Sequence, residues 1–459
     1  MSIFKKFFGS NAEEGASDTQ TASKPETSTT TTTSINGLQR SNFPFGRYTD
    51  RNKTNEQIAY WGDAVKAFDE KRYFDSFEIL MKYIGDPEIG NLKYSRNGDK
   101  IEFEFVQGSN VISGHAEGDK FVAISEIVLM ETPNVPVMRK LMSSNYSLKY
   151  SKFALKDNIV CMKLSSKIED ASPNKLYYGL REMARKADRE DDLLISEFGS
   201  VKEVGEDKTI PYSEEKMAVL LKYLDQWIRD TLEEVGKHDK DNFCGAIAFL
   251  LLRLSYRIDY LLKPQGQLMD RLEKIQHMFF AQNNETTQQR NEKIIAEFND
   301  ILNWDEAKKR EGLYETISTF ALINPSDHKP VMDMMFDEMK KADWYINNNY
   351  PVFIKSIFEY SVAYAFFNYG MHYPTMHLWD MLMEIFNPDF YKEMGIDNQY
   401  INGDQLNSAN INKRISYIIK EAKKEFPNID LRVENINYGD LTQFYTSLMK
   451  EADYLNYSK

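Results

Sequence analysis

Apolar residues recur at helical spacing over residues 58–84, which predicts two helices joined near Lys71. Over residues 93–130 the spacing becomes two, and Asn97-Gly98 and Gly118-Asp119 have the composition of tight turns between antiparallel strands. We therefore expect the two helices to be followed by a meander of three strands.

Residues 147–173 carry the most regular pattern of the chain. A Lys-Asp-Asn turn at residues 156–158 separates two predicted strands, because Asp and Asn tolerate tight turns. Ser172 and Pro173 then have the residue types of an N-cap and a first helical position. The segment is predicted to be a β-hairpin that leads into a helix.

The second strand of this hairpin is apolar on both faces. Val160, Met162 and Leu164 share one face, whereas Ile159 and Cys161 share the other. A helix can cover only one face of a sheet, so the second face needs another cover. The early helix, the C-terminal half, a second copy of the chain and a partner segment are the alternatives.

Two further helices complete this half of the chain. "VPVMRKLMSS" predicts a short helix over residues 135–143, before the hairpin. The helix after the hairpin has an apolar stripe with "RKADREDD" on its outer side. The stripe consists of Leu176, Leu180, Met183, Ala184 and Ala187. The predicted fold class is thus an α+β module of order α-βββ-α-ββ-α with an antiparallel sheet.

This order, with "VMRKLMSSNYSLKYSKFALKDNIVCMKL" in its middle and "YYGLREMARKADREDDLL" at its end, resembles the type III secretion chaperone-like fold, particularly its YbjN-type branch. The resemblance covers about residues 73–194 and rests on the element order, the helix leading into Asn145, the tight hairpin and the Ala187-Asp188 step. It implies a non-enzymatic module that binds a protein segment or a second copy of itself across a partly apolar surface. The chain is much longer than the secretion chaperones themselves.

Residues 213–459 show helical stripes without a strand pattern, and they predict an all-α domain after a linker at residues 201–212. Ser213 is expected to cap the first of these helices. The segment "YPVFIKSIFEYSVAYAFFNYG" is apolar and aromatic on nearly every side, so we expect a buried central helix there.

Residues 1–50 are predicted to form a disordered tail before the α+β module of residues 51–200. The tip "MSIFKKFFGS" would make at most a weak membrane contact, and residues 10–34 contain no Val, Leu, Ile, Met or aromatic residue. Phe43 and Phe45 lie in "NFPFGRY", which is either a docking segment or the first packed turn of a domain. We favour the packed turn.

Composition excludes several classes of function. The chain has 57 Lys and Arg against 70 Asp and Glu, a net charge of -13, which disfavours nucleic acid as a ligand. Its two cysteines form no metal or redox motif and favour a reducing, cytoplasmic location. No apolar run is long enough for stable membrane insertion.

Motifs for catalysis are missing from the sequence. It contains no GxxxxGK[ST], GxSxG or HExxH, and His372 and His377 are not spaced for one helical face. Acidic residues such as Glu190, Asp191 and Asp192 are expected on the solvated surface. We predict no catalytic, metal or cofactor site.

These patterns favour a cytoplasmic, non-enzymatic protein-binding protein, chaperone-like or an adaptor, that binds a protein partner or itself as a homodimer. The alternatives are a structural component of a larger bacterial assembly and an enzyme with an unrecognised site in the helical half. The predicted partner-binding side chains are Phe103, Phe105, Val160, Met162, Leu164, Phe43 and Phe45.

Overall fold

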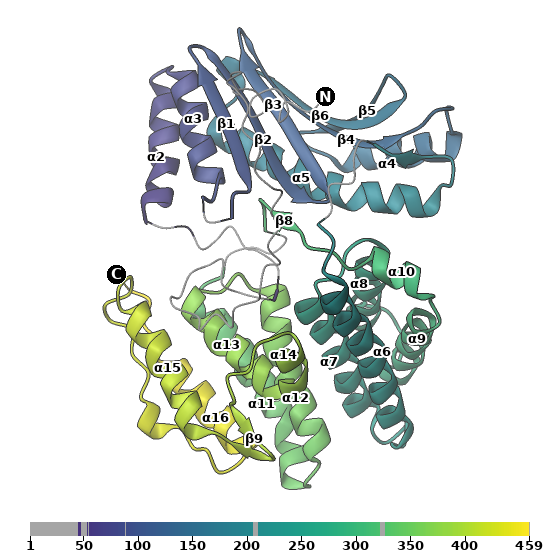
Figure 1. Cartoon of the computed structure of the whole chain (residues 1–459), viewed down its shortest axis with the longest axis vertical. Coiled ribbons are helices and arrows are strands. Elements are labelled where there is room, and N and C mark those ends of the chain that lie inside the picture. Colours follow the sequence, from purple (N-terminus) through teal and green to yellow (C-terminus); the bar gives the residue numbers. More distant parts are fainter. Residues whose placement is uncertain are drawn as a thin grey trace, which may run out of the picture.

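The computed structural model describes residues 45–46, 53, 55–87, 89–204, 210–321 and 326–458. An α+β module lies at the top of Figure 1, and a helical half lies below it. The N-terminal antiparallel sheet and the helical C-terminal half were both predicted from the sequence, and both are confirmed.

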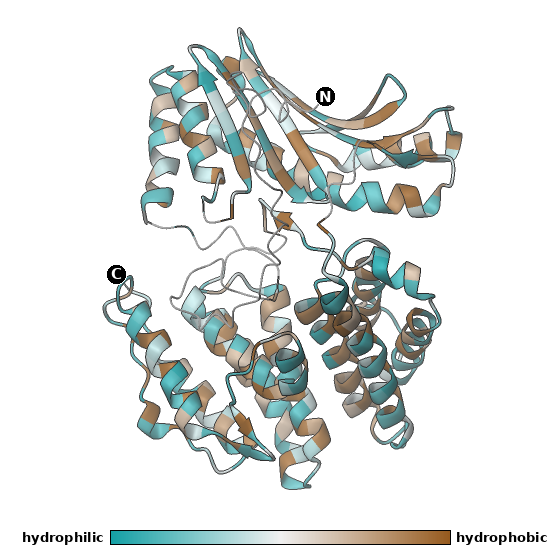
Figure 2. Cartoon of the chain, viewed as in Figure 1, coloured by the Kyte–Doolittle hydropathy of each residue, from teal (hydrophilic) through white to brown (hydrophobic). Residues whose placement is uncertain are grey.

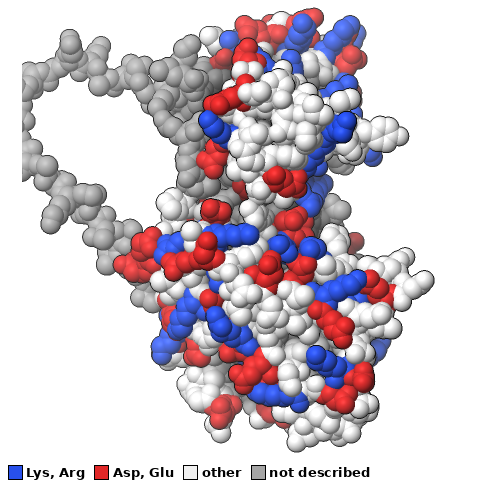
Figure 3. Space-filling view, turned by 90° about the vertical axis from the view of Figure 1, so that its right-hand side faces the viewer, with Lys and Arg blue, Asp and Glu red and all other residues white. Residues whose placement is uncertain are grey.

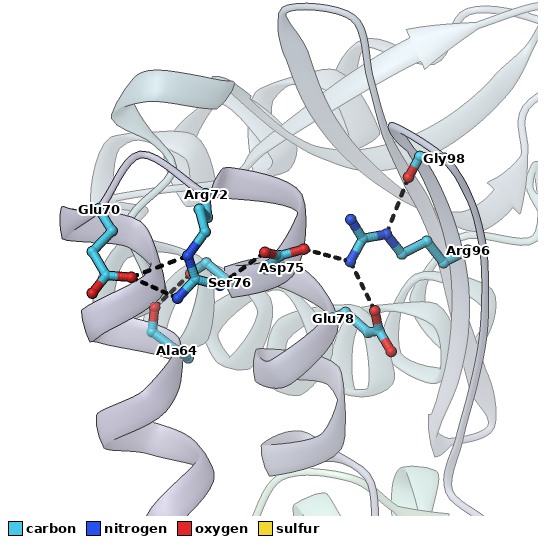
Figure 4. Close-up of polar contacts among 8 residues, drawn as sticks. All are labelled: Ala64, Glu70, Arg72, Asp75, Ser76, Glu78, Arg96 and Gly98. Carbon is cyan, nitrogen blue, oxygen red and sulfur yellow. Dashed lines mark hydrogen bonds and ion pairs between the residues drawn. The ribbon is translucent and has the colours of Figure 1, made fainter.

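The module begins with a helical hairpin. It comprises α2 (Asn55–Asp69) and α3 (Tyr73–Ile84), which are joined through Lys71 at a φ of 61°. Ion pairs between α3 and the neighbouring strand are drawn in Figure 4: Arg96 bonds Asp75 at 2.8 Å and Glu78 at 2.9 Å. Because these groups remain partly exposed to solvent, the ion pairs orient the hairpin more than they stabilise it.

The first strand of the sheet, β1, lies at its edge. The strands are β1 (Leu92–Asn97), β2 (Lys100–Gly108), β3 (Asn110–Glu117), β4 (Lys120–Leu129), β5 (Lys152–Lys156) and β6 (Ile159–Lys167). Their order is β1-β2-β3-β4-β6-β5, and every pair is antiparallel. A short β7 (Lys202–Glu203) pairs with β4.

The meander has four strands where the sequence predicted three. The segment read as one continuous pattern is divided at Gly108, which has a φ of 57°. Since glycine adopts this conformation without a steric penalty, the chain can reverse at Gly108 and Ser109 and begin β3 at Asn110.

The hairpin and its following helix agree with the sequence. Asp157 and Asn158 turn the chain from β5 to β6 at positive φ values of 49° and 65°. The Ser172 side chain accepts a hydrogen bond from the Lys175 amide and caps α5 (Pro173–Glu197). The predicted stripe of α5 is fully buried.

One face of the sheet is covered by helices. Among the described helices, α5 packs on β2, β3, β4 and β6, α3 on β1 and β2, and α4 (Val135–Ser147) on β5. No described helix packs on the opposite face (Figure 1). Val122, Ile124 and Val111 on that face are partly exposed, while Cys161 is buried among its neighbours. The second cover that the sequence required is therefore absent among the described elements.

The helical half is built around α7 and α12. Figure 2 shows the hydrophobic residues of α7 among its neighbouring helices. The helices are α6 (Glu214–Gly236), α7 (Cys244–Leu262), α8 (Gly266–Phe280), α9 (Thr287–Leu302), α10 (Glu306–Glu311), α11 (His328–Asn347), α12 (Pro351–Asn368), α13 (Tyr373–Phe386), α14 (Pro388–Glu393), α15 (Ser408–Ala422) and α16 (Leu441–Ala452). Ser213 caps α6, and α12 is buried at the centre, as predicted.

This half is not purely helical. It contains the short strands β8 (Ile317–Ser318), β9 (Ile401–Asn402) and β10 (Gln405–Leu406), which corrects the all-α prediction. Strand β8 pairs with β2, and the buried Gln107 side chain accepts from the amides of Thr319 and Phe320. Phe320 lies in the core of the α+β module. The two halves therefore share structure beyond the predicted linker.

Candidate functional site

Five of the side chains predicted to contact a partner lie in the core of the α+β module. Phe103, Phe105, Val160, Met162 and Leu164 are at most 2 % exposed. They lie on the sheet face covered by α3 and α5, where the Phe105 ring meets the Phe320 ring at 5.7 Å. The prediction that these side chains form a binding surface is therefore corrected.

Phe45 also packs inside the chain. Its ring lies 4.8 Å from the Tyr391 ring, and the Gly46 amide donates to the Tyr260 carbonyl at 2.8 Å. This is the packed turn that we favoured, so the predicted tail of residues 1–50 does not extend unbroken to residue 50. Phe43 and the aromatic tip of the chain lie outside the described residues.

Exposed apolar side chains concentrate at the end of the module that carries α4 and β5. Of the eleven large apolar side chains exposed among the described residues, six lie within residues 135–178. They are Val135, Met142, Tyr146, Tyr150, Leu155 and Tyr178. Tyr146 is 96 % exposed and Met142 is 69 % exposed. A concentration of exposed apolar side chains of this kind is typical of an interaction surface.

Helix α4 has two apolar stripes. Val137 and Leu141, four residues apart, face the sheet and are buried. A second stripe, which we call the outer stripe, consists of Val135, Met138, Met142 and Tyr146 at spacings that keep them on one helical side. Met138 is partly buried against the core, and the other three members are exposed. A helix packed on one side only would not require this second stripe.

Side chains block the free edge of β5. Asn145 of α4 accepts from the Phe153 amide at 2.7 Å and donates to the Phe153 carbonyl at 3.1 Å. Glu182 of α5 accepts from the Ser151 amide at 2.9 Å. Burial acts to raise the pKa of Glu182, but hydrogen bonds from the backbone of Ser151, Lys149 and Tyr150 outweigh it and lower the pKa. An incoming strand would therefore find the outward groups at Ser151 and Phe153 already occupied.

Exposed basic residues lie on α4, just after its end, and on the uncovered face of β5 and β6. Arg139, Lys149, Lys152, Lys156 and Lys163 are exposed and form no ion pair with any described residue. Lys152 and Lys163 are directly opposite in the register of β5 and β6, an arrangement that is unfavourable without an anion nearby. In Figure 3, the upper body shows an uncharged area with Lys and Arg along one side.

A cleft of about 1000 Å³ lies between α5 and the helical half. Tyr150 and Tyr178 line its upper side, and Tyr260 and Phe366, whose rings stack at 4.1 Å, line its lower side. Several of its charged groups are paired within the chain, for example Arg189 with Glu273 at 3.3 Å. The cleft thus extends the aromatic surface at the α4 end, and its polar groups serve mainly to join the two halves.

The acidic residues near the end of α5 are not on the solvated surface, where the sequence placed them. Glu190 is 4 % exposed and Asp191 is 8 % exposed. Asp191 accepts hydrogen bonds from Ser109 at 2.8 Å and from Asn110. Burial, then the charges of neighbouring Asp192 and Asp188, raises the pKa of Asp191 well above its usual value. The prediction that Glu190 and Asp191 are solvent-exposed is therefore corrected. The pattern along α5 does not indicate that Ser109 and Asn110, where β2 ends and β3 begins, pack against this part of the helix.

We expect Asp192→Asn to stabilise the protein at pH 7. Burial, then the charge of Glu203, raises the pKa of Asp192 to about 6. The unfolded value is about 4, so the free energy of unfolding falls as the pH rises through the interval between the two values. Urea unfolding at pH 7 should therefore show a gain of about 1–2 kcal/mol for the variant, and the gain should vanish near pH 4. Asp404→Asn, at an exposed turn, is the control; an equal change in both variants at both pH values would contradict the prediction.

Metal and catalytic sites find little support in the described residues. No group of three or more His, Cys, Asp or Glu side chains among them is arranged to hold a metal ion. His377 is buried beside Arg414, and Asp380 accepts hydrogen bonds from the hydroxyls of Tyr260 and Tyr391 at 2.8 Å each. Burial raises the pKa of Asp380. These groups link α13 to α7 and α14 inside the core.

Comparison with known proteins does not assign the chain to a family. No family model matches the chain, and no curated protein matches it in sequence. The resemblance to the type III secretion chaperone-like fold therefore stays a prediction. No described helix combines the length and apolar composition that a membrane span requires.

Proposed function

We propose that this chain is a non-enzymatic protein-binding protein, an adaptor or chaperone-like, whose α+β module binds a protein partner through helix α4. One observation carries the proposal: the outer stripe exposes Val135, Met142 and Tyr146 on a helix whose other stripe is already packed in the core. Full burial of an apolar side chain is worth about 1.5–3 kcal/mol, so a partner that covers the stripe gains substantially.

A helix-on-helix contact fits this surface better than addition of a strand. The outward backbone groups of β5 at Phe153 are bonded to Asn145, whereas nothing described covers Met142 or Tyr146. Side chains at helical spacing on an exposed helix suit an amphipathic partner helix. Tyr150 and Tyr178 extend the apolar surface towards the cleft.

A cytoplasmic location belongs to the same proposal. Cys161 and Cys244 are both free thiols, which suits a reducing compartment. A homodimer through α4 and a structural role in a larger assembly are the remaining protein-binding alternatives. For the enzyme alternative, the buried Asp380 group offers no support, because Asp380 and its hydrogen-bond partners are packed in the core.

Site-specific photo-cross-linking in the cells of origin tests the proposal. A photoreactive amino acid at Tyr146, which is 96 % exposed on α4, should produce a discrete cross-linked protein. The same amino acid at Tyr454, which is 68 % exposed beyond α16, is the matched control and should not. Absence of a product at Tyr146, or the same product at both positions, would contradict a specific contact at α4.

A further inference from the structure

We infer that the uncovered face of the sheet binds an acidic segment of a protein across β4, β6 and β5. Helix α4 packs with Val137 and Leu141 in the core on the other face, so this site is distinct from the outer stripe and goes beyond the proposed function. Its basis is a set of exposed side chains on these three strands. The set, which we call the lysine face, consists of Lys120, Lys152, Lys156, Lys163 and Lys167.

The register of the strands places the five lysines on one face. Lys120 lies opposite Lys167 in the pairing of β4 with β6. Lys152 lies opposite Lys163 in the pairing of β5 with β6. Side chains directly opposite each other share a face, and so do residues four apart along a strand, so all five point the same way. The side chains that alternate with them are buried on the covered face, among them Phe121, Phe153 and Met162.

The lysine pairs contrast with other cross-strand pairs on the same face. Lys93 of β1 lies opposite Glu104 of β2. Lys100 of β2 lies opposite Glu117 of β3, and their charged groups are 3.4 Å apart. Like charges directly opposite on neighbouring strands destabilise a sheet, whereas opposite charges stabilise it. The sheet thus has matched charges at the end that contains β1 and repelling charges at the end that contains β5, where an anion would relieve the repulsion.

The carboxylates near the lysine face do not neutralise it. Glu117 is also opposite Lys120, but its carboxylate already pairs with a lysine of β2. Lys167 lies 3.8 Å from Glu169, and because these side chains are 68 % and 66 % exposed, the pair is weak. Glu126, on the same side of β4, forms no ion pair with any described residue. The same holds for the three lysines of β5 and β6 that remain.

Protection of an edge strand does not account for these lysines. Lysine on an edge strand hinders pairing with another chain, which would explain Lys152 and Lys156 of β5. Lys163 and Lys120, however, lie on the interior strands β6 and β4, where no such protection is needed. The free edge of β5 is moreover already blocked by side chains of α4 and α5. A ligand with negative charge therefore explains the lysine face better.

The residues between the lysines favour a protein as the source of the negative charge. Val122 and Ile124 of β4 lie on the same face and are partly exposed. Nucleic acids bind sheet faces through aromatic rings that stack on the bases, and β4, β6 and β5 present no aromatic ring on this face. The two lysine pairs are about 13 Å apart, four residues along β6. An acidic segment with aliphatic side chains between carboxylates at this spacing would contact both.

Two other occupants fit this face less well. A two-fold contact centred on the lysine face would bring the lysines of two copies together and add to their repulsion. An anionic membrane is disfavoured because the net charge of -13 repels the chain from such a surface.

Two fluorescein-labelled peptides of about 14 residues, long enough to cross the three strands, would test the inference. The acidic peptide has two Glu-Glu pairs about 13 Å apart with Val and Ile between them, and the neutral peptide has Gln in place of Glu. Fluorescence anisotropy with the full chain at low salt should show that the acidic peptide binds at least about tenfold more tightly. The difference should shrink in about 0.5 M salt.

The double variant Lys152→Gln, Lys163→Gln should lose at least about tenfold in affinity for the acidic peptide. Its melting temperature should not fall, because both side chains are exposed and their repulsion is removed. The matched control is Lys329→Gln, Lys340→Gln, which removes the same charge from side chains of α11 that are 76 % and 73 % exposed. The control should bind the acidic peptide as the parent chain does.

Several results would overturn the inference. One is that the acidic peptide does not bind, or that the Lys152→Gln, Lys163→Gln variant binds it as tightly as the parent chain does. Another is that a single-stranded oligonucleotide or phosphatidylserine vesicles bind more tightly than the acidic peptide, which would assign the face to nucleic acid or to a membrane. Dimerisation of the parent chain that the same variant abolishes would assign it to a second copy.

The proposed function fails or stands separately. Met142→Asp on α4 should leave the affinity for the acidic peptide unchanged, and the protein cross-linked at Tyr146 should still be captured by the Lys152→Gln, Lys163→Gln variant. Loss of the cross-linked protein together with peptide binding in either variant would show that the two surfaces form one site, which overturns the inference of a separate one.

Discussion

Replacing Glu359 by Leu should lower the free energy of unfolding by about 3–5 kcal/mol, because it leaves buried cations without their carboxylate. Glu359 lies on α12 and is fully buried. It accepts a hydrogen bond from Arg257 Nη2 at 2.6 Å and another from Asn387 at 2.9 Å. Arg253 Nε lies 4.0 Å from the same carboxylate.

The charge states of this cluster support the size of the effect. Burial acts to raise the pKa of Glu359, but Arg257 outweighs it and the pKa is lowered. Burial, then the charge of Arg257, lowers the pKa of Arg253 to about 10. Glu359 and Arg253 are therefore both charged at pH 7, and removal of the carboxylate would leave Arg253 and Arg257 without their shared acceptor.

Urea unfolding followed by circular dichroism at pH 7 measures the loss. Glu306→Leu is the matched control: its carboxylate pairs with Arg310 at 2.8 Å but is 68 % exposed, so its loss should cost less than about 0.5 kcal/mol. Replacing Arg257 by Met together with Glu359 should recover part of the stability. A Glu359→Leu variant no less stable than the control would show that the cluster is unimportant.

Met162→Asp should prevent the α+β module from folding. The side chain is fully buried on the helix-covered face of β6, opposite Ser125 of β4. The change removes core packing and buries an unpaired carboxylate, at a cost above about 4 kcal/mol. Such a loss approaches the whole stability of a typical domain.

The adjacent residue supplies the control for Met162→Asp. Lys163→Asp places the same side chain one position later, on the exposed face of the sheet. It should keep the melting temperature of the parent protein and relieve the repulsion with Lys152. A soluble Met162→Asp protein with an unchanged melting temperature would mean that the α5 side of the sheet is an interface and not a core.

Local chemistry made parts of the fold predictable. The β5–β6 hairpin follows from Asp157 and Asn158, which accept the positive φ values that the turn needs. The start of α5 follows from Ser172 and Pro173, and its buried stripe follows from helical spacing. These features depend on neighbours in the sequence, so the sequence contains the information that defines them.

Contacts between distant segments were not predictable in the same way. Alternation along β2 shows that Phe103 and Phe105 share a face, but it does not reveal which face α5 covers. Their assignment to a binding surface was wrong for this reason. The pairing of β8 with β2 and the burial of Asp191 against Ser109 likewise join residues that are far apart in the sequence.

The outer stripe of α4 was only partly predictable from the sequence. Val135, Met138 and Met142 are spaced as one side of a helix. The predicted helix ended at Ser143, whereas α4 continues to Ser147 and therefore includes Tyr146. The last turn has no sharp stop signal, and the extension depends on the bonds of Asn145 to Phe153.

The central claim is that α4 binds a protein partner through its outer stripe, and the double variant Met142→Asp, Tyr146→Asp tests it most directly. Both side chains are exposed, so the melting temperature of the variant should match that of the parent chain. Quantitative mass spectrometry of the purified full chain from its own cells should show at least a tenfold loss of the protein that cross-links at Tyr146. Retention of that protein at the parent level by a correctly folded variant would contradict the claim.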